Sequence, residues 1–328
     1  MRFNSIKLIS NTLLLFIYLS ISSIANANNE EWLSYEGKGD NPQHIVLISG
    51  GEEYRSEEAL PQLAKILSSR HGFKTTLLFS QDPKAPGIIA PNHLANIPGL
   101  EHLESADLMV IFARFRDLPN QQMATIDAFL KAGKPVVGIR TATHAFWIKP
   151  ENKKSNWHHY SFDYKGDEDG SWQGGFGRFI LGETWVAHEG DHKQQSTRGF
   201  IDPDAINHPI LNGIKDGDIW GPTDVYSISL PLPDNAQSLL LGQVVERNKP
   251  FNETDLLFGL DETDNIPASK NSKGNIVNDP MMPIAWTHSY QLPEGKMGHS
   301  FTSTIGSSSD FLNEGVRRLL VNGIYWSL

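Results

Sequence analysis

His44-Ile45-Val46-Leu47-Ile48-Ser49-Gly50-Gly51 is a short, continuous apolar run that two glycines close. A run of this length without polar alternation is typical of a strand buried on both faces of a sheet. A helix should follow, because Ser56 is suited to cap a helix and the carboxylates of Glu57 and Glu58 complement its positive end. This stretch therefore predicts the first strand and helix of an α/β sheet.

Further segments continue the alternation of strand and helix. We predict strands over 73–79, 106–113 and 135–139, and a helix over 121–132. Strands that alternate with helices of this length predict an α/β fold with a mostly parallel sheet flanked by helices. The chain shows no internal repeat, and we expect a single domain over 44–328 with long loop insertions.

The second half of the chain is less regular. Residues 150–200 are rich in Gly, His, Trp and Asp, and we interpret them as a long structured insertion. Residues 248–279 are polar and predict an excursion over the surface. Strands are expected at 236–244, 282–286 and 297–302. From Ser309 we expect a helix whose apolar stripe comprises Phe311, Leu312, Val316, Leu319, Leu320 and Ile324.

The first residues follow the plan of a secretory signal peptide. Arg2 and Lys7 give a basic start, an apolar stretch runs from Leu8 to Ile21, and Ala25-Asn26-Ala27 supplies the small residues of a cleavage site. We expect residues 1–27 to be removed by cleavage after Ala27, and the protein to be periplasmic or secreted. An uncleaved membrane anchor is the alternative, but polar residues interrupt the apolar run before it reaches the about 20 residues that a span needs.

Composition restricts the classes of function. The chain has no cysteine, 28 Lys and Arg residues, 38 Asp and Glu residues, and a net charge of −10, which becomes −12 without Arg2 and Lys7. Nucleic-acid binding is disfavoured, because it depends on a basic surface that neutralises phosphates. After a polar N-terminal lead over 28–43, the fold must rest on burial without disulfides. An intrinsic nicotinamide site is disfavoured, because no G-x-G-x-x-G opens a helix after a strand.

Polar and cationic side chains follow the predicted strands, at the edge of a parallel sheet where ligands bind. They comprise Glu52, Glu53, Tyr54 and Arg55 after the first strand, Arg114 and Arg116 after the third, and Arg140, Thr141, Thr143 and His144 after the fourth. Four arginines at strand ends favour one crevice for a carbonyl, a carboxylate or vicinal hydroxyls. We predict substrate contacts for Tyr54, Arg55, Arg114, Arg116 and Thr141. The alternative is that each arginine ties down a loop through an acidic partner such as Glu52, Asp117 or Glu183.

The turn Gly138-Ile139-Arg140-Thr141-Ala142-Thr143-His144 stands where hydrolases and amidotransferases present a nucleophile on a sharp strand-to-helix elbow. The nucleophile is missing, because the chain has no cysteine and no G-x-S-x-G pattern. His144 is instead a candidate general acid or base, and Arg140 a candidate for polarising a carbonyl. The alternative for His144 is a helix-start histidine that the backbone satisfies.

His188-Glu189-Gly190-Asp191-His192 spells H-E-x-x-H, the pattern of zinc proteases. That interpretation is disfavoured, because Gly190 sits in the middle and no apolar helical face continues beyond it. Two readings stay open: His188 and His192, with His144 or His158, hold a divalent metal such as zinc from a loop, or they contact a substrate. Asp224 adds a polar group near another predicted strand end, and we predict that it binds substrate.

Several blocks together resemble the trehalose-utilisation (ThuA-like) family, and the match runs from about His44 to the C-terminus. They are Glu53–Pro61, Arg114–Pro119, Gly138–Phe146, Gly182–Trp185 and Leu312–Gly315. The resemblance implies a flavodoxin-like sheet of the class I glutamine amidotransferase type that lacks the catalytic cysteine, so a glutaminase is not expected. It also adds Glu183 to the predicted substrate contacts. In the family, histidines persist around His188 and His192 without the glutamate.

Founding members of this family are linked to the use of trehalose and related disaccharides, in which sugars are oxidised at the 3-position to keto forms. The resemblance therefore implies a protein of carbohydrate utilisation, and the signal-peptide pattern of residues 1–27 adds the expectation that it is exported. Our first hypothesis is acid–base chemistry on a keto-sugar or glycoside, with His144 and His188 as acid and base and Arg140 beside them. The alternatives are a non-catalytic sugar or polyol binding module and a metal-dependent hydrolase that uses the histidines. The expected partner is a small sugar or sugar derivative, with no nucleic acid and no stable membrane anchor; a homo-oligomer stays open.

Overall fold

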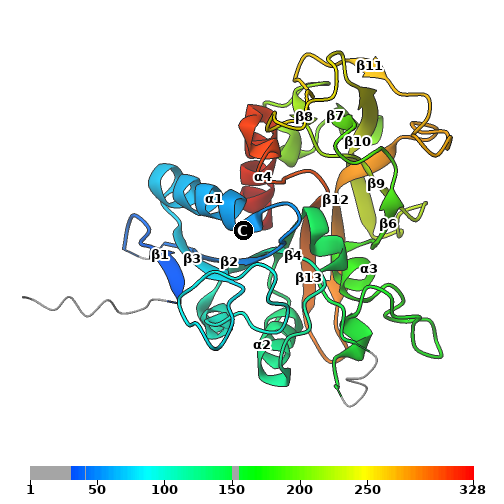
Figure 1. The fold of residues 1–328 in the computed structure, drawn as a ribbon. Helices are drawn as coiled ribbons and strands as arrows, with labels where there is room; N and C mark the ends of the chain where they lie inside the picture. The colour runs from blue at the N-terminus through cyan, green and yellow to red at the C-terminus, as the bar shows by residue number, and fades with distance from the viewer. Residues whose placement is uncertain (1–30, 41, 150–154) are drawn as a thin grey trace, which may run out of the picture.

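One sheet of eleven strands organises the residues that this computed structural model describes, 31–40, 42–149 and 155–328 (Figure 1). In spatial order its strands are β1 (Trp32–Tyr35), β3 (Lys74–Phe79), β2 (His44–Gly50), β4 (Leu108–Ala113), β5 (Val136–Ile139), β13 (Met297–Ser303), β12 (Met282–Gln291), β10 (Ala236–Glu246), β7 (Gln195–Ile201) and β8 (Ile219–Gly221), and β11 (Ile266–Pro267) pairs with β10. A separate two-stranded sheet joins β6 (Trp185–His188) to β9 (Tyr226–Ile228).

The sheet has a parallel half and an antiparallel half. Strands β3, β2, β4, β5 and β13 pair in parallel, whereas β13, β12, β10, β7 and β8 pair antiparallel. The predicted mostly parallel sheet is therefore wrong for the sheet as a whole. The three strands predicted in the second half exist as β10, β12 and β13, and they are antiparallel neighbours in the sheet. The segments that connect them contain no helical crossover, which parallel pairing would need.

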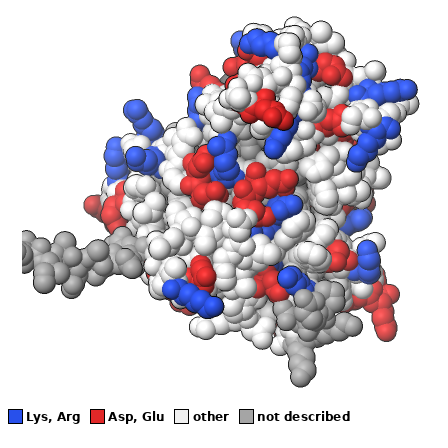
Figure 2. All heavy atoms as spheres, in the orientation of Figure 1, with Lys and Arg blue, Asp and Glu red and all other residues white. Residues whose placement is uncertain are grey.

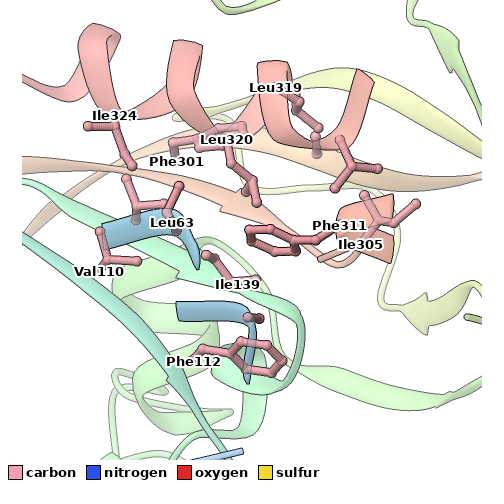
Figure 3. Close-up of a cluster of buried hydrophobic side chains, with 14 of the residues drawn as sticks. Leu63, Val110, Phe112, Ile139, Phe301, Ile305, Phe311, Leu319, Leu320 and Ile324 are labelled. Carbon is pink, nitrogen blue, oxygen red and sulfur yellow. The ribbon is translucent and has the colours of Figure 1, made fainter. Parts of the chain in front are cut away.

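Helices cover both faces of the sheet (Figure 1). Helices α1 (Ser56–His71) and α4 (Glu314–Ser327) pack on one face, and α2 (Asn120–Lys131) and α3 (Gly175–Leu181) on the other. Alternate residues of β2 enter the two cores, Ile45 and Leu47 on the α1 side and Val46 and Ile48 on the α2 side. Figure 3 shows the first core, in which α4 contributes Leu319, Leu320 and Ile324 beside Phe301 and Phe311.

Several local expectations need correction. Ser56 begins α1 without capping it, since Arg55 is the cap residue and Ser56 Oγ instead accepts a hydrogen bond from the Gly51 N–H at 2.8 Å. Leu312 is 60 % exposed and lies outside the apolar stripe of α4. The expected insertion over 150–200 contains β7, a full member of the sheet.

The N-terminal part of the chain is only partly described. The predicted polar lead over 28–43 contributes β1, an edge strand paired antiparallel with β3. The predicted signal peptide, residues 1–27, lies outside the described residues. Within the described ranges, no helix has both the length and the apolar character needed to span a membrane.

Close packing at α4 leads to a first prediction. A Cβ on Gly323 would lie 2.2 Å from Cδ1 of Phe301, in the core between α4 and β13. We expect Gly323→Val to lower the free energy of unfolding by roughly 1–3 kcal/mol, because overpacking forces neighbouring side chains to shift. Urea titration measures the change. Arg318→Ala, which removes an exposed ion pair with Glu314 on the same helix, should change the free energy of unfolding by less than about 0.5 kcal/mol. Equal stability of the Gly323→Val protein and wild type would contradict the packing seen here.

Candidate functional site

Arg140 occupies the strand-to-helix elbow at the end of β5. Its φ of 51° lies in the left-handed region, and a short 3₁₀ turn, Arg140–His144, begins with it. A non-glycine residue held there is strained by about 1–3 kcal/mol, and such strain collects at functional sites. The position that carries a nucleophile in elbow enzymes therefore carries a guanidinium, which is 1 % exposed.

The guanidinium of Arg140 holds the loop that carries Asp224. Its Nη1 donates to the carbonyl oxygens of Asp224 at 2.8 Å and Thr304 at 2.6 Å, and its Nη2 donates to Oδ1 of Asp224 at 3.1 Å. The rings of Tyr226 and Tyr54 flank it, at 3.8 and 4.3 Å from Cζ to the ring centroids. Burial alone would raise the pKa of Asp224, but Arg140 and two histidine hydrogen bonds lower it well below its usual range. The carboxylate is therefore ionised although it is buried.

Asp224 orients two imidazoles. Nδ1 of His188 donates to Oδ2 at 2.6 Å, and Nδ1 of His192 donates to Oδ1 at 3.1 Å. The pairing of β6 with β9 sets His188 opposite Tyr226, and Asp224 precedes Tyr226 by two residues. Both histidine side chains are about one-third exposed, whereas that of Asp224 is fully buried. With Nδ1 held by the carboxylate, Nε2 of each ring is the nitrogen left for a ligand or a proton.

His144 lies in an aromatic enclosure behind this pair. It is 3 % exposed, and its ring lies 5.0 Å from Trp185, 5.2 Å from Phe115 and 5.9 Å from Tyr226 between centroids. Burial, followed by the charges of Arg114 and Arg140, lowers the pKa of His144 well below its ordinary value. His144 is therefore a neutral imidazole at physiological pH, and Nδ1 lies 3.2 Å from Oγ1 of Thr143.

Tyr54 joins the site to a cavity. Its hydroxyl lies 3.5 Å from Nδ1 of His192, and burial raises the pKa of Tyr54 to about 12, so the phenol stays neutral. A cavity of about 410 Å³, lined by Tyr54, Arg55 and His192 among others, opens beside these rings. That volume lies within the range of small-molecule sites.

The other strand-end arginines have acidic partners. Glu52 bridges Arg114 at 2.5 Å and Arg116 at 2.6 Å. Arg116 is fully buried and also donates to backbone carbonyls, whereas Arg55 pairs with Glu58 at the surface. The four arginines therefore do not present four free guanidinium groups to one ligand. Arg114, Arg116 and Arg140 have acidic partners distant in the chain, whereas Arg55 pairs with Glu58 of the helix that it precedes and lines the cavity. Figure 2 likewise shows acidic and basic side chains intermixed near the middle of the face that it displays.

Two predicted substrate contacts are deeply buried. Thr141 is fully buried behind the elbow, where its Oγ1 lies next to Gly51. Glu183 is also fully buried, and burial raises the pKa of its carboxyl; Arg178 lies 3.7 Å away. These positions favour a supporting role for both residues, and their contact with substrate stays a prediction.

The residues His188, His192 and Asp224 also form a group whose ligand atoms lie within 4.8 Å of one another. The H-E-x-x-H segment is not helical: His188 is the last residue of strand β6, and bends and a turn follow it. The zinc-protease arrangement, which needs a helix, is therefore absent from this segment. The donor set fits a metal poorly in the present arrangement. Both oxygens of Asp224 already accept hydrogen bonds, and the Arg140 cation lies 3.1 Å from one of them, which opposes a second cation there.

Sequence reasoning missed Tyr226 and gave Trp185 no role. Tyr226 contacts Arg140, His144 and His188, and it is fully buried with a pKa raised well above its ordinary value by burial. One signal was available: residues two apart in an extended segment point the same way, so Tyr226 follows Asp224 onto the same face. The enclosure by Phe115 and Phe162 has no comparable signal in the sequence.

Comparison with known proteins gives matches among solved structures alone. No family model and no curated protein matches the sequence. A protein from Bacteroides uniformis ATCC 8492 aligns at 14 % identity and a TM-score of 0.48, covering 89 % of this chain and 95 % of that one. A protein from Parabacteroides merdae ATCC 43184 aligns at 14 % identity and a TM-score of 0.48, covering 88 % and 90 %. Both neighbours are described as ThuA-like.

Proposed function

We propose that the protein is an exported enzyme that acts on a keto-sugar or a glycoside by acid–base chemistry, with His188 as the group that moves the proton. The observation that carries the chemistry is the buried, ionised carboxylate of Asp224, 2.6 Å from Nδ1 of the partly exposed His188. A carboxylate in this place fixes the tautomer and leaves the lone pair of Nε2 toward solvent. The sugar class and the export are inferences from the sequence resemblance and from residues 1–27.

In this proposal, neutral His188 takes a proton through Nε2 from a substrate carbon beside a carbonyl, or from a hydroxyl. The resulting imidazolium is stabilised by Asp224, and return of the proton to the substrate or to a leaving oxygen restores the neutral ring. Arg140 does not meet the substrate, because it is buried and its Nη1 and Nη2 donate to Asp224 and Thr304. We therefore assign it to positioning Asp224, in place of the carbonyl-polarising role predicted from sequence.

His144 supports the proposed site as a neutral, desolvated imidazole. Its low pKa and its enclosure suit a hydrogen-bonding or acid–base partner that does not carry charge at rest. The acid or base role predicted for it from the sequence stays a prediction. A neutral ring in this place avoids repulsion with Arg114 and Arg140, whose charges disfavour its protonated form.

Turnover of 3-keto-glycosides by the purified chain tests the proposal. We expect wild type to form products detectable by chromatography and His188→Gln to turn over at least about 100-fold more slowly, since general acid–base groups contribute 10²–10⁴. His71→Gln serves as the control, because His71 is an exposed histidine of α1 that contacts Tyr325. Binding of sugars without any product would favour the non-catalytic module. Equal rates for His188→Gln and wild type would exclude His188 as the proton-transferring group.

The metal-dependent hydrolase is the second candidate. The ligand atoms of His188, His192 and Asp224 lie within 4.8 Å of one another, but the Arg140 cation beside Asp224 opposes a metal there. Dialysis against a chelator and metal analysis of the purified protein separate the two. Activity that is lost with the chelator and restored by Zn²⁺ would support the metal reading. Activity that survives removal of metal supports the acid–base proposal.

A further inference from the structure

A second cavity lies at the opposite edge of the sheet from the proposed site. Its volume is about 410 Å³, and its lining comes from the segment before α3, from α3 itself and from the end of β12. In the register of the strands, His288 pairs with Ser300 of β13, and Ser300 pairs with Val136, the first residue of β5. Arg140 follows the last residue of β5. The cavity, hereafter the Arg178 cavity, therefore lies at the end of the strands away from Arg140.

The lining of the Arg178 cavity carries positive charge without negative charge, although the whole chain has a net charge of −10. Its polar side chains include one guanidinium, one imidazole and three carboxamides, from Arg178, His288, Gln173, Asn235 and Gln291. None of its described lining residues is acidic. By contrast, three carboxylates border the cavity beside Tyr54. The lining of the Arg178 cavity therefore favours a ligand that is negatively charged.

The guanidinium of Arg178 is available to such a ligand. The side chain is 41 % exposed, and its ion-pair partner Glu183 lies 3.7 Å from Nη1, which is beyond hydrogen-bond length. Within the described residues, this guanidinium makes no hydrogen bond. Asp167 and Asp169 precede the lining segment, but both are exposed and accept hydrogen bonds from Ser171. Arg178 therefore keeps its donors for a carboxylate, which a guanidinium binds through two parallel hydrogen bonds.

His288 offers the same cavity a hydrogen-bond acceptor. Its Nδ1 donates to the carbonyl oxygen of Ile180 at 3.1 Å, so Nδ1 carries the proton of the neutral ring. His288 is 6 % exposed, and burial lowers its pKa, so the ring is neutral at physiological pH. Nε2 then keeps a lone pair, which accepts a hydrogen bond from a hydroxyl group of the ligand.

Contacts within the wall hold the Arg178 cavity in one shape. Trp172 stacks on Phe179, with their ring centroids 4.1 Å apart. The Ile180 carbonyl that holds His288 also accepts a hydrogen bond from Oγ of Ser300 at 2.8 Å, which ties the end of α3 to β13. A wall that is already ordered reduces the entropy cost of binding.

We propose that the Arg178 cavity is a second binding site, for a small hydroxy acid, a molecule that carries a carboxylate and at least one hydroxyl group. Arg178 binds the carboxylate, and Nε2 of His288 accepts a hydrogen bond from the hydroxyl. The volume suits a ligand of about six carbons. Arg140, His144, His188 and Asp224 are absent from the described lining, so this inference goes beyond the proposed function and does not depend on it.

Three probes with six carbons each separate the two contacts. D-gluconate carries a carboxylate and hydroxyls, sorbitol carries hydroxyls without the charge, and hexanoate carries the carboxylate without hydroxyls. In isothermal titration calorimetry, we expect wild type to bind gluconate at least about tenfold more tightly than sorbitol or hexanoate, because hydrogen bonds to charged groups are worth that much. Equal affinity for gluconate and sorbitol, or no heat of binding with gluconate, would overturn the proposal.

Variants of the lining locate the bound gluconate. Arg178→Gln should weaken gluconate binding at least about tenfold and leave sorbitol binding unchanged, and Arg178→Lys should lie between Arg178→Gln and wild type, because an ammonium is a point charge without the fork. His288→Asn should weaken the binding of gluconate but not of hexanoate. Asparagine keeps a donor for the Ile180 carbonyl and loses the acceptor at Nε2.

Two further variants serve as controls, and urea titration checks that every variant is folded. Arg318→Gln removes an exposed arginine of α4 that does not line the cavity, and it should bind gluconate as wild type does. His188→Gln should also bind gluconate as wild type does, whatever its effect on turnover. Unchanged gluconate affinity in Arg178→Gln, or a loss of affinity in His188→Gln, would overturn the assignment of the ligand to the Arg178 cavity.

Discussion

Asp224→Asn should lower kcat for 3-keto-glycoside turnover by about 10³-fold, because the carboxamide reverses the hydrogen bond that orients His188. Oδ2 of Asp224 now accepts from Nδ1 of His188. An amide NH₂ in its place donates, which forces the proton onto Nε2 and removes the lone pair that takes the substrate proton. Steady-state kinetics measure the loss, and ¹⁵N NMR of the histidine rings reports the change of tautomer.

The control for this variant is Asp204→Asn, an exposed aspartate of the 3₁₀ turn Pro203–Ala205 that follows β7. It should keep kcat within twofold and leave the tautomer of His188 unchanged. Circular dichroism of both variants checks that they are folded. A folded Asp224→Asn protein with wild-type kcat would rule out the role of Asp224 in the proposed chemistry.

Arg140→Met should lower the free energy of unfolding at pH 7 by roughly 3–5 kcal/mol, the usual result of removing one partner of a buried ion pair. Methionine fills similar volume, but Asp224 is left buried without its cation, and the carbonyl oxygens of Asp224 and Thr304 lose a donor. Urea titration measures the change. Arg178→Met should cost less than about 1 kcal/mol, since that side chain is 41 % exposed and lies 3.7 Å from Glu183.

The stability of the Arg140→Met protein should also depend on pH in a different way from that of wild type. The folded-state pKa of Asp224 is depressed in wild type, so its contribution to stability is present above the unfolded pKa of about 3.9 and is lost as pH falls through the folded value. Without Arg140, burial dominates and raises the pKa of Asp224, so the folded variant takes up a proton at higher pH than wild type. The difference in stability between the two proteins should therefore shrink between pH 7 and pH 3. A difference independent of pH would show that Arg140 acts through packing alone.

The parallel half of the fold could be predicted from sequence because its strands are buried on both faces. Such strands appear as apolar runs, and β2 and β4 match the predicted segments within two residues at each end. The antiparallel half gives a weaker signal. Strand β7 contains Gln195, Ser196, Thr197 and Arg198, and its polar residues are buried by tertiary contacts such as the bond from Thr197 Oγ1 to the Thr223 carbonyl.

For the site, sequence patterns indicated which residues gather but not which of them meet a ligand. Arg140, His144 and His188 do converge on Tyr226. The roles of these side chains depend on their burial and their hydrogen-bond partners. Arg140 and His188 both bind Asp224, which is 84 residues from Arg140 in the chain. A long-range ion pair of this kind leaves no local pattern, so an arginine that appeared free for substrate is in fact occupied.

The contacts of Arg140 span the seam between the two halves of the sheet. It belongs to the parallel half, yet its donors reach acceptors 84 and 164 residues away along the chain. Contacts of such separation close late in folding, after the local strands and helices have formed. The oriented imidazoles therefore exist only in chains whose halves have docked, and recovery of activity during refolding reports that docking instead of the earlier gain of secondary structure.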